Sequence, residues 1–452
     1  MQHRVSRREL LVGMGAMAGA GVLAACAPAA QAPQSQPAAE EQGSTQAPAA
    51  AGGEQTTVRI FDYDPTGTDL WVTADAEFTT YFAEKYPDIK VEREQAPWAG
   101  FAEKLLTSLA GGSKFDVIYG YWEWLPLFVE NNAVGPLDDL IEADPEISAD
   151  DFFDYAKEMV DGKTYGLAWF ISSHFFWYNK TRVEAAGQPD PKELDKQGKW
   201  DYTAWYEFAK AMTGEEDGAP VFGFEMGNFG ITTVYCMPAW AHGSDLWNED
   251  FSDCLLDQPV HTDIWKYLQT FYKEGLTPMP GQTGQGEQGP GFTNGRVAGT
   301  EAGQWLGRTL VQEKTPDLFD IGMVRFPTGP AGTYAVAALN SYYFSSAPSD
   351  PTAAFTWYKE RSFSEAAYKI YGPIGVGPFP SRKSIAPVAV FPFEDTEVYE
   401  SIRPTMHAYR TSPKETEFSA LFTAAYDEMI LETRPIEQIL AQLAEEAEAL
   451  NQ

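Results

Sequence analysis

The alternation of strand-like and helix-like segments between residues 57 and 119 constrains the fold more than any other feature of the chain. Residue patterns predict three strands at 57–61, 89–92 and 115–119, and two helices at 74–86 and 101–110. Pro87 ends the first helix, and Gly111-Gly112 follows the second as a C-terminal cap requires. Strands separated by helices in this order form a parallel sheet, whose ligands bind beyond the carboxyl ends of the strands.

The stretch FDVIYGYWEWLPLF at 115–128 places aromatic rings at such a strand end. Tyr119, Tyr121, Trp122 and Trp124 close or follow the third strand, and Glu123 lies among them. Exposed ring faces beside an acid suit a ligand that is apolar on its flat sides and hydroxylated at its rim. The same rings would be core residues if they pointed inward, so the pattern alone leaves both interpretations open.

The remaining chain repeats these signals and is long enough for a second lobe. With 452 residues it exceeds what one hydrophobic core usually organises, so two lobes are expected. Further strands are expected at 165–171, 175–180, 221–226, 319–324 and 333–344, and helices at 202–212, 261–272, 353–363, 365–371 and 436–450. The last helix gives the clearest signal, because its apolar residues form one stripe.

Residues 1–25 have the order of an export signal: basic residues, then a stretch of about 14 apolar residues that is too short to span a bilayer, then small residues. The pair Arg7-Arg8, followed by Leu10-Leu11, resembles a twin-arginine signal, with general secretion as the alternative. Leu23-Ala24-Ala25-Cys26 resembles a lipobox, in which Cys26 receives a lipid and becomes the new N-terminus. The protein is therefore expected to be lipid-anchored at the outer face of the cytoplasmic membrane, or in the periplasm.

Residues 26–56 lack aromatic and β-branched aliphatic side chains, so they are expected to form a disordered tether. The net charge of the whole chain is −33. Removal of residues 1–25 takes away three basic residues and one acid, which leaves 29 basic and 64 acidic residues and a charge of −35. Such a charge, without any basic run, argues against nucleic acid as a partner. Cys236 and Cys254 could form a disulfide outside the cell or remain two buried free thiols.

Five segments along the chain carry a family resemblance. They are FDVIYGYWEWLPLFVENNAVGPLDDLI (115–141), YGLAWFISSHFFWYNKTRVEAAG (165–187), WDYTAWYEFAKAMT (200–213), FTNGRVAGTEAGQW (292–305) and IGMVRFPTGPAGTY (321–334). In this order they resemble the sugar-binding extracellular solute-binding proteins of ABC importers, the family that includes maltose-binding protein. The resemblance covers residues 57–452, and its main departure is Asn340-Ser341 where the family usually has Gly-Gly near the third crossing between lobes.

This resemblance implies an α/β fold of the two-lobe periplasmic-binding-protein type (type II), with a ligand cleft between lobes joined by crossing segments. The expected lobes are 57–165 plus 300–345 and 166–299 plus 346–452. The implied partners are a small carbohydrate and the membrane subunits of an ABC permease, and a monomer is expected.

The candidate ligand-binding residues lie at strand ends, at crossings and in one late loop, and combine stacking surfaces with hydrogen-bonding groups. They are Tyr63, Asp64, Trp98, Trp122, Glu123, Trp240, Trp305, Ser341, Tyr342 and Arg382. Each ring taken alone is equally well explained as core, and Arg382 as a surface ion pair. The set therefore supports the site better than any member does.

Signatures of enzymes and cofactors are weak. Residues 284–289 fit Gly-x-Gly-x-x-Gly, but no strand precedes them and Pro290 follows where a helix should start. The five histidines are scattered, without a zinc motif. We therefore expect no cofactor, no metal and no catalytic residue, and a protein that captures a mono- or oligosaccharide by lobe closure. There are two alternatives: a binding protein for a cationic or other polar solute, and a secreted glycoside hydrolase.

Overall fold

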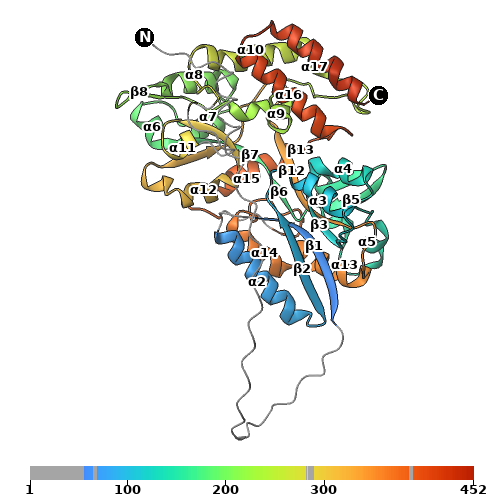
Figure 1. The fold of residues 1–452 in the computed structure, drawn as a ribbon. Helices are drawn as coiled ribbons and strands as arrows, with labels where there is room; N and C mark the ends of the chain where they lie inside the picture. Colours follow the sequence, from blue (N-terminus) through green and yellow to red (C-terminus); the bar gives the residue numbers. More distant parts are fainter. Residues whose placement is uncertain (1–54, 65–68, 281, 283–289, 386–389, 452) are drawn as a thin grey trace, which may run out of the picture. The chain divides into compact units, whose positions relative to one another are not determined.

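The computed structural model describes residues 55–64, 69–280, 282, 290–385 and 390–451. The expected export signal, Cys26 and nearly all of the expected tether lie outside the described residues. All elements below belong to the unit formed by Gly53–Gln452 (Figure 1).

The first sheet has its strands in the order β13-β12-β3-β1-β2, with β6 also paired to β12. These strands are β1 (Thr56–Tyr63), β2 (Ile89–Ala96), β3 (Val117–Tyr121), β6 (Phe170–Ser172), β12 (Ala335–Phe344) and β13 (Met406–Ala408). β1 is parallel to both β2 and β3, so the parallel unit predicted from the sequence is confirmed. The carboxyl ends of these three strands therefore lie at one edge of the sheet. β12 comes from late in the chain and is antiparallel to β3.

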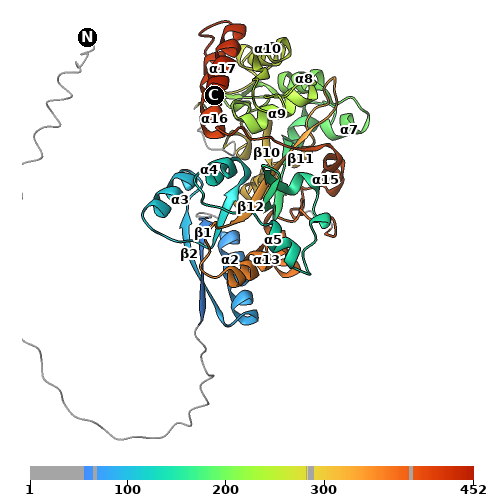
Figure 2. The same cartoon turned by 90° about the vertical axis from the view of Figure 1, so that its right-hand side faces the viewer.

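Helices from both halves of the chain pack with this sheet in a first core cluster (Figures 1 and 2). They are α2 (Asp69–Lys85), α3 (Phe101–Ala110), α13 (Pro351–Phe363) and α14 (Glu365–Tyr371). Phe78 and Phe82 lie one turn apart on α2 and are both buried, as the helical period predicts. The bounds of α3 and α14 agree with the predicted ranges.

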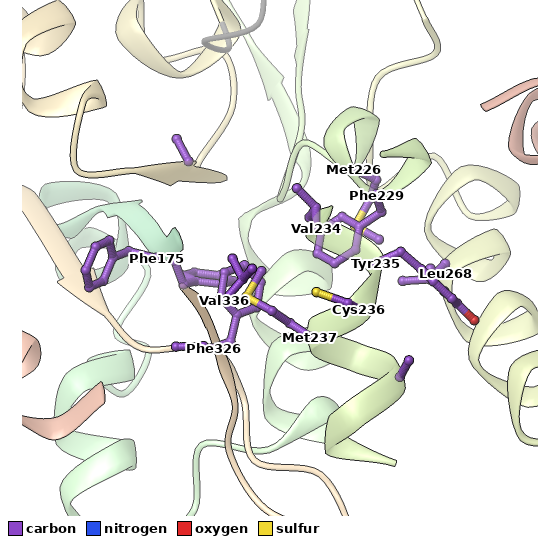
Figure 3. Packing of buried hydrophobic residues seen from close by; sticks show 14 of the residues in the cluster. Phe175, Met226, Phe229, Val234, Tyr235, Cys236, Met237, Leu268, Phe326 and Val336 are labelled. Carbon is purple, nitrogen blue, oxygen red and sulfur yellow. The ribbon is translucent and has the colours of Figure 1, made fainter. Parts of the chain in front are cut away.

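The second sheet has the order β10-β7-β11, with β7 antiparallel to both neighbours. Its strands are β7 (His174–Asn179), β10 (Gly299–Gly303) and β11 (Ile321–Val324), and a second core cluster joins it to α8 (Tyr202–Met212), α9 (Thr232–Ala241), α10 (Pro259–Lys273), α16 (Glu415–Ile430) and α17 (Ile436–Leu450). Figure 3 shows Val234, Cys236 and Met237 of α9 within this cluster. The bounds of α8 and α17 agree with the predicted helices.

Two parts of this region differ from the sequence analysis. α9 was not predicted, because all of its residues are buried and a helix buried on every side carries no apolar stripe. The strand expected at 221–226 is wrong beyond Val221, where β9 (Ala219–Val221) ends. Gly223 lies so close to the Ala209 carbonyl that a Cβ would come within 1.8 Å of its oxygen, and beyond Val221 the segment forms isolated bridges, Phe222 with Val297 and Glu225 with Thr300.

Several further elements connect these sheets and helices. They are η1 (Trp122–Trp124), α4 (Leu125–Glu130), α5 (Asp138–Ala143), β4 (Lys157–Val160), β5 (Lys163–Leu167), α6 (Lys180–Ala185), α7 (Pro191–Lys196), β8 (Gly214–Glu216), α11 (Pro290–Thr293), α12 (Leu306–Gln312), η7 (Gly372–Ile374) and α15 (Thr396–Ile402).

Three segments pass from one core cluster to the other and lie side by side. They are 169–171, 338–341 and 379–380, and we call them the crossing layer. The amide of Trp169 donates to the Asn340 carbonyl at 2.9 Å, and the amide of Ile171 donates to the Phe379 carbonyl at 3.0 Å. Because backbone hydrogen bonds join all three segments, the two core clusters are connected by one continuous layer.

The core clusters divide the late part of the chain differently from the lobe ranges given by the resemblance. α13 and α14 pack in the first cluster, whereas Leu306, Leu310 and β11 pack in the second. β12 contributes to both, since Ala335 to Leu339 lie in the second cluster and Tyr342 to Phe344 in the first. The lobe ranges themselves stay a prediction.

The Asn340 side chain ties three strands together at the crossing layer. It is buried, its Oδ1 accepts from the Tyr119 hydroxyl at 2.9 Å, and its Nδ2 donates to Ser172 Oγ at 3.2 Å. The departure from the family's glycines therefore adds a polar link between β3, β12 and β6.

Replacement of Asn340 by alanine is expected to lower the free energy of unfolding by about 1–3 kcal/mol, because it leaves the Tyr119 and Ser172 hydroxyls short of a partner in a buried site. Urea unfolding of Asn340→Ala and wild type measures the difference. The matched control is Asn131→Ala, since Asn131 is exposed and bonds only the Leu127 carbonyl. Equal losses in the two variants would show that the Asn340 contacts contribute nothing specific.

Candidate functional site

The rings predicted at the ends of β1, β2 and β3 form a continuous row. The Tyr63 and Trp98 ring centroids are 5.9 Å apart, those of Trp98 and Tyr121 are 4.8 Å apart, and those of Tyr121 and Trp122 are 4.8 Å apart and stacked. Parallel strands bring these rings together, since their carboxyl ends share one edge of the sheet. Asp64 follows Tyr63 directly, is half-buried, and donates its amide to the Ala96 carbonyl at 2.7 Å.

Trp122 extends this row to the other lobe. Only 4% of it is exposed, it belongs to the second core cluster, and its centroid is 5.6 Å from that of Tyr409. Its indole Nε1 is buried without a hydrogen-bond partner among the described residues. We use the term junction for the place where residues packed with the first sheet meet residues of the second cluster.

Two acids also meet at the junction. The Glu415 carboxylate accepts hydrogen bonds from the Tyr409 hydroxyl at 2.8 Å and the Ser412 amide at 2.9 Å. Burial raises the pKa of Glu415 to about 7, although these hydrogen bonds oppose the shift. Part of Glu123 is accessible to solvent, but the protein packed around its carboxyl, and then the Glu415 charge, raise the pKa of Glu123 to about 8.

An ion pair and an arginine complete the contacts across the junction. Lys414, the residue directly before α16, has its Nζ 3.1 Å from Glu130 Oε1 of α4. Arg308 of α12 donates from Nη1 to the Ile374 carbonyl at 3.0 Å, and its guanidinium lies 5.2 Å from the centre of the Trp71 ring. The Arg308 Nε has no partner among the described residues, and burial lowers the pKa of this side chain. Arg308 was not among the residues predicted from the sequence, although its position one turn beyond Trp305 is a usable signal.

The two tryptophans predicted in the later chain lie in different surroundings. Trp305 meets the His174 ring edge to face at 5.0 Å, and His174 Nδ1 in turn contacts the Glu301 carboxylate. Gly303 allows this arrangement, because a Cβ there would come within 1.8 Å of the Trp305 ring. Trp240 instead packs near His407, with 5.6 Å between the ring centroids. His174 and Glu301 were not predicted from the sequence, since their pairing depends on the register of β7 with β10.

The last three predicted residues are engaged within the protein. Ser341 is fully buried and donates to the Glu158 carboxylate, and Tyr342 donates to Asp62 Oδ1 at 3.0 Å. Arg382 Nε lies 2.6 Å from Asp151 Oδ2, and its Nη1 donates to the Phe363 carbonyl. They are not part of the row of rings, and contact between them and a solute stays a prediction.

The two later cysteines are separate thiols in the structure. Cys236 and Cys254 are both buried and unbonded, and Cys236 Sγ donates to the Thr233 carbonyl at 3.1 Å. Of the two alternatives left open by the sequence, the structure shows two buried free thiols. Within the described ranges, no group of three or more His, Cys, Asp or Glu side chains could hold a metal ion, and no helix is long and apolar enough to cross a membrane.

Comparison with known proteins gives the class of the chain. The model of the bacterial extracellular solute-binding protein family matches residues 65–359. Proteins of Brucella abortus (strain 2308) and Brucella suis biovar 1 (strain 1330), both named as binding proteins, are 28% identical to this chain over 260 residues. That match covers 56% of this chain and 60% of each relative, less than two thirds of their length.

Solved structures show the same fold at low sequence identity. An ABC substrate-binding protein from Listeria monocytogenes in complex with cycloalternan has a TM-score of 0.76 and 19% identity, over 88% of this chain and 99% of that chain. The GacH receptor of Streptomyces glaucescens has a TM-score of 0.73 and 16% identity, over 88% of this chain and 98% of that chain. The chain belongs to the family of bacterial extracellular solute-binding proteins, and it has their two-lobe α/β fold.

The acids at the junction make stability depend on pH. The pKa of Glu123 is raised from 4.5 to about 8, so between these values the folded state binds a proton that the unfolded state does not. The stability from this neutral carboxyl is complete below about pH 4.5 and is lost as the pH rises through about 8. We expect Glu123→Gln to gain up to about 4 kcal/mol relative to wild type between pH 5 and pH 8.5, because about three pH units lie between pH 5 and the raised pKa.

Urea unfolding at the two pH values measures this gain. Glu184→Gln is the matched control, because it makes the same substitution at an exposed position on α6, away from the junction. A gap between Glu123→Gln and wild type that stays constant from pH 5 to pH 8.5 would contradict the expectation.

Proposed function

We propose that this protein is the substrate-binding lipoprotein of an ABC importer, and that it captures a mono- or oligosaccharide by closing its lobes and delivers it to the permease. It acts as a monomer, leaves the solute chemically unchanged, and is held through Cys26 at the outer face of the cytoplasmic membrane. The observation that carries this proposal is the row of rings from Tyr63 to Trp122, which reaches Tyr409 of the other lobe.

The row and its surroundings offer the two kinds of surface that a sugar requires. The C–H faces of a sugar ring lie on indole and phenol faces, and its hydroxyls need donors and acceptors in a site shielded from water. Trp122 Nε1, Arg308 Nε and Glu301 Oε2 are buried polar atoms without a partner among the described residues. An unpaired buried polar group costs about 1–3 kcal/mol, so a solute that pairs with these atoms gains that stabilisation.

The ligands of similar structures support the same class of solute. One such structure contains cycloalternan, another α-D-tagatose and a third mannobiose. These are a cyclic oligosaccharide, a monosaccharide and a disaccharide, so the fold accommodates carbohydrates of different size in other proteins. The row of rings at the junction of this chain could likewise stack on a monosaccharide or on a larger saccharide.

Three contacts between the lobes support the proposal that the protein closes around its solute. Trp122 with Tyr409, Lys414 with Glu130, and Arg308 with the Ile374 carbonyl all connect residues packed with the first sheet to the second cluster. A solute that touches both lobes adds binding free energy only to the closed form, and so shifts an open–closed equilibrium toward it. We place the lobe boundaries where the core clusters divide, with α13 and α14 in the first lobe.

A thermal-shift screen tests the class of solute. We expect at least one of tagatose, mannobiose, maltotriose or cycloalternan to raise Tm in a concentration-dependent way, since a ligand specific to the folded state stabilises it. Chromatography after several hours should recover that saccharide intact, because no hydrolysis is proposed. A rise with spermidine and with none of the saccharides would instead identify a cationic solute, and consumption of the saccharide would identify a hydrolase.

Substitution of Trp305 tests the predicted stacking residues. For the saccharide that stabilises the protein most, we expect Trp305→Ala to raise Kd at least tenfold, which is a loss of about 1.4 kcal/mol, measured by isothermal titration calorimetry. Tyr206→Ala is the matched control, because it removes a partly buried ring that bonds Glu274 at the surface of α8. Wild-type Kd values for both variants would contradict a binding role for Trp305.

A further inference from the structure

Arg308 of α12 connects the second core cluster to the first. Its neighbours Leu306 and Leu310 pack in the second cluster, whereas its own side chain contacts two residues of the first. Nη1 donates to the Ile374 carbonyl at 3.0 Å, and the guanidinium lies 5.2 Å from the centre of the Trp71 ring. Arg308 is therefore a cationic group placed where the two lobes meet.

The row of rings lies beside this guanidinium. Burial lowers the pKa of Arg308, and the phenol groups of Tyr63 and Tyr119 act against that shift. Tyr63 begins the row, and the Tyr119 ring lies next to it, with 5.9 Å between the two ring centroids. A solute on the Tyr63 end of the row would therefore lie beside Arg308.

Arg308 has no acidic partner in the part of the chain that the structure describes. It forms no ion pair there, and no carboxylate offsets the effect of burial on its pKa. Its Nε is buried without a hydrogen-bond partner among the same residues. Because an arginine side chain stays charged in proteins, a partly buried positive charge is left without a neighbouring negative one.

The chain treats two other buried arginines differently. Asp62 and Asp75 form ion pairs with Arg93, at 2.5 and 3.2 Å. Although burial opposes it, the pKa of Arg361 is raised, and the same two acids contribute to the rise. Two acids thus balance two arginines in the first lobe, and neither acid affects the pKa of Arg308.

The two acids that meet at the junction do not supply the missing charge. Glu123 and Glu415 form no ion pair with Arg308, and burial, joined at Glu123 by the Glu415 charge, raises their pKa values to about 8 and about 7. At pH 6 both carboxyls are therefore mostly protonated. In this state they neither balance Arg308 nor repel an anionic solute.

We propose that the saccharide bound at the junction carries a carboxylate, as a uronic acid does, and that Arg308 pairs with this group. The inference rests on the proposed function, since it adds a charge requirement to the same sugar site. Nη1 is already bonded to Ile374, so Nε and Nη2 remain, and their parallel N–H groups match the two oxygens of a carboxylate. A neutral hydroxyl also accepts a hydrogen bond, but only an anion balances the charge.

This pairing also couples the charge to closure. Arg308 belongs to the second lobe and the row of rings to the first. A saccharide that stacks on the rings and pairs with Arg308 touches both lobes only in the closed form, and so favours that form.

Matched pairs of charged and neutral saccharides test the charge requirement. Disaccharides of glucuronic, galacturonic and mannuronic acid are compared with their methyl esters by isothermal titration calorimetry at pH 6, where free carboxyl groups are ionised. We expect at least one acid to bind at least tenfold more tightly than its ester.

The other outcomes separate this inference from the proposed function. Esters that bind as tightly as their acids, or binding of neutral saccharides alone, would overturn the charge requirement and leave sugar capture intact. Binding of no saccharide of either kind would overturn both.

Arg308→Gln tests the residue itself. In this variant the preference for the acid over its ester should fall below about threefold, because the balancing charge is gone, while the Kd of the ester stays within about threefold of wild type. Retained ester binding also shows that the variant is folded.

The matched control is Arg434→Gln, which removes the same charge from an ion pair with Glu428 near the other end of α16. This variant should keep the wild-type preference for the acid. An unchanged preference in Arg308→Gln, or loss of acid and ester binding together, would contradict a pairing role for Arg308.

Discussion

The crossing layer is the constraint on which the rest of the structure depends. Three segments from distant parts of the chain must leave one hydrophobic core and enter the other, and each carries backbone groups that need partners when buried. The segments hydrogen-bond one another: the Trp169 amide donates to the Asn340 carbonyl, and the Ile171 amide donates to the Phe379 carbonyl. Because their hydrogen bonds lie in one layer, this layer is the connection about which the proposed closure of the lobes would turn.

The strand ends beside this layer are held by buried polar groups. Arg93 of β2 pairs with Asp62 of β1 at 2.5 Å and with Asp75 of α2 at 3.2 Å, and Tyr342 of β12 donates to the same Asp62. Removal of one partner would leave a buried charge uncompensated, so the network positions β1, β2 and β12 strictly relative to one another. The rings that follow β1 and β2 are thereby presented at a defined spacing, as a stacking surface requires.

Much of the fold could be predicted from the sequence, because its elements carry strong periodic signals. α8 and α17 each have one buried face, and the parallel unit alternates strands with helices, so their patterns show these elements. α9 could not be predicted, since it is buried on every side and contains Pro238. Its helical conformation depends on the core around it rather than on its own pattern.

The candidate site was predictable where it depends on strand ends. Tyr63, Trp98 and Trp122 come together because their strands are parallel neighbours, which the sequence order already implies. Arg308 and the His174–Glu301 pair were not predictable, because they depend on the packing of α12 and the register of β7 with β10. Arg382 was predicted to contact the ligand, but in the structure it forms an ion pair with Asp151. The sequence does not show this pair, because the two residues are 231 positions apart in the chain.

Closure of the two lobes about a solute at the crossing layer is tested most directly by a distance across the junction. Spin labels at Asn131 and Glu417, both exposed and next to the Glu130–Lys414 pair, report the separation of α4 and α16. Double electron–electron resonance should show a longer, broader distribution without saccharide and a shorter, narrower one with the saccharide that raises Tm. An identical distribution in both states, with binding confirmed in the same sample, would contradict lobe closure.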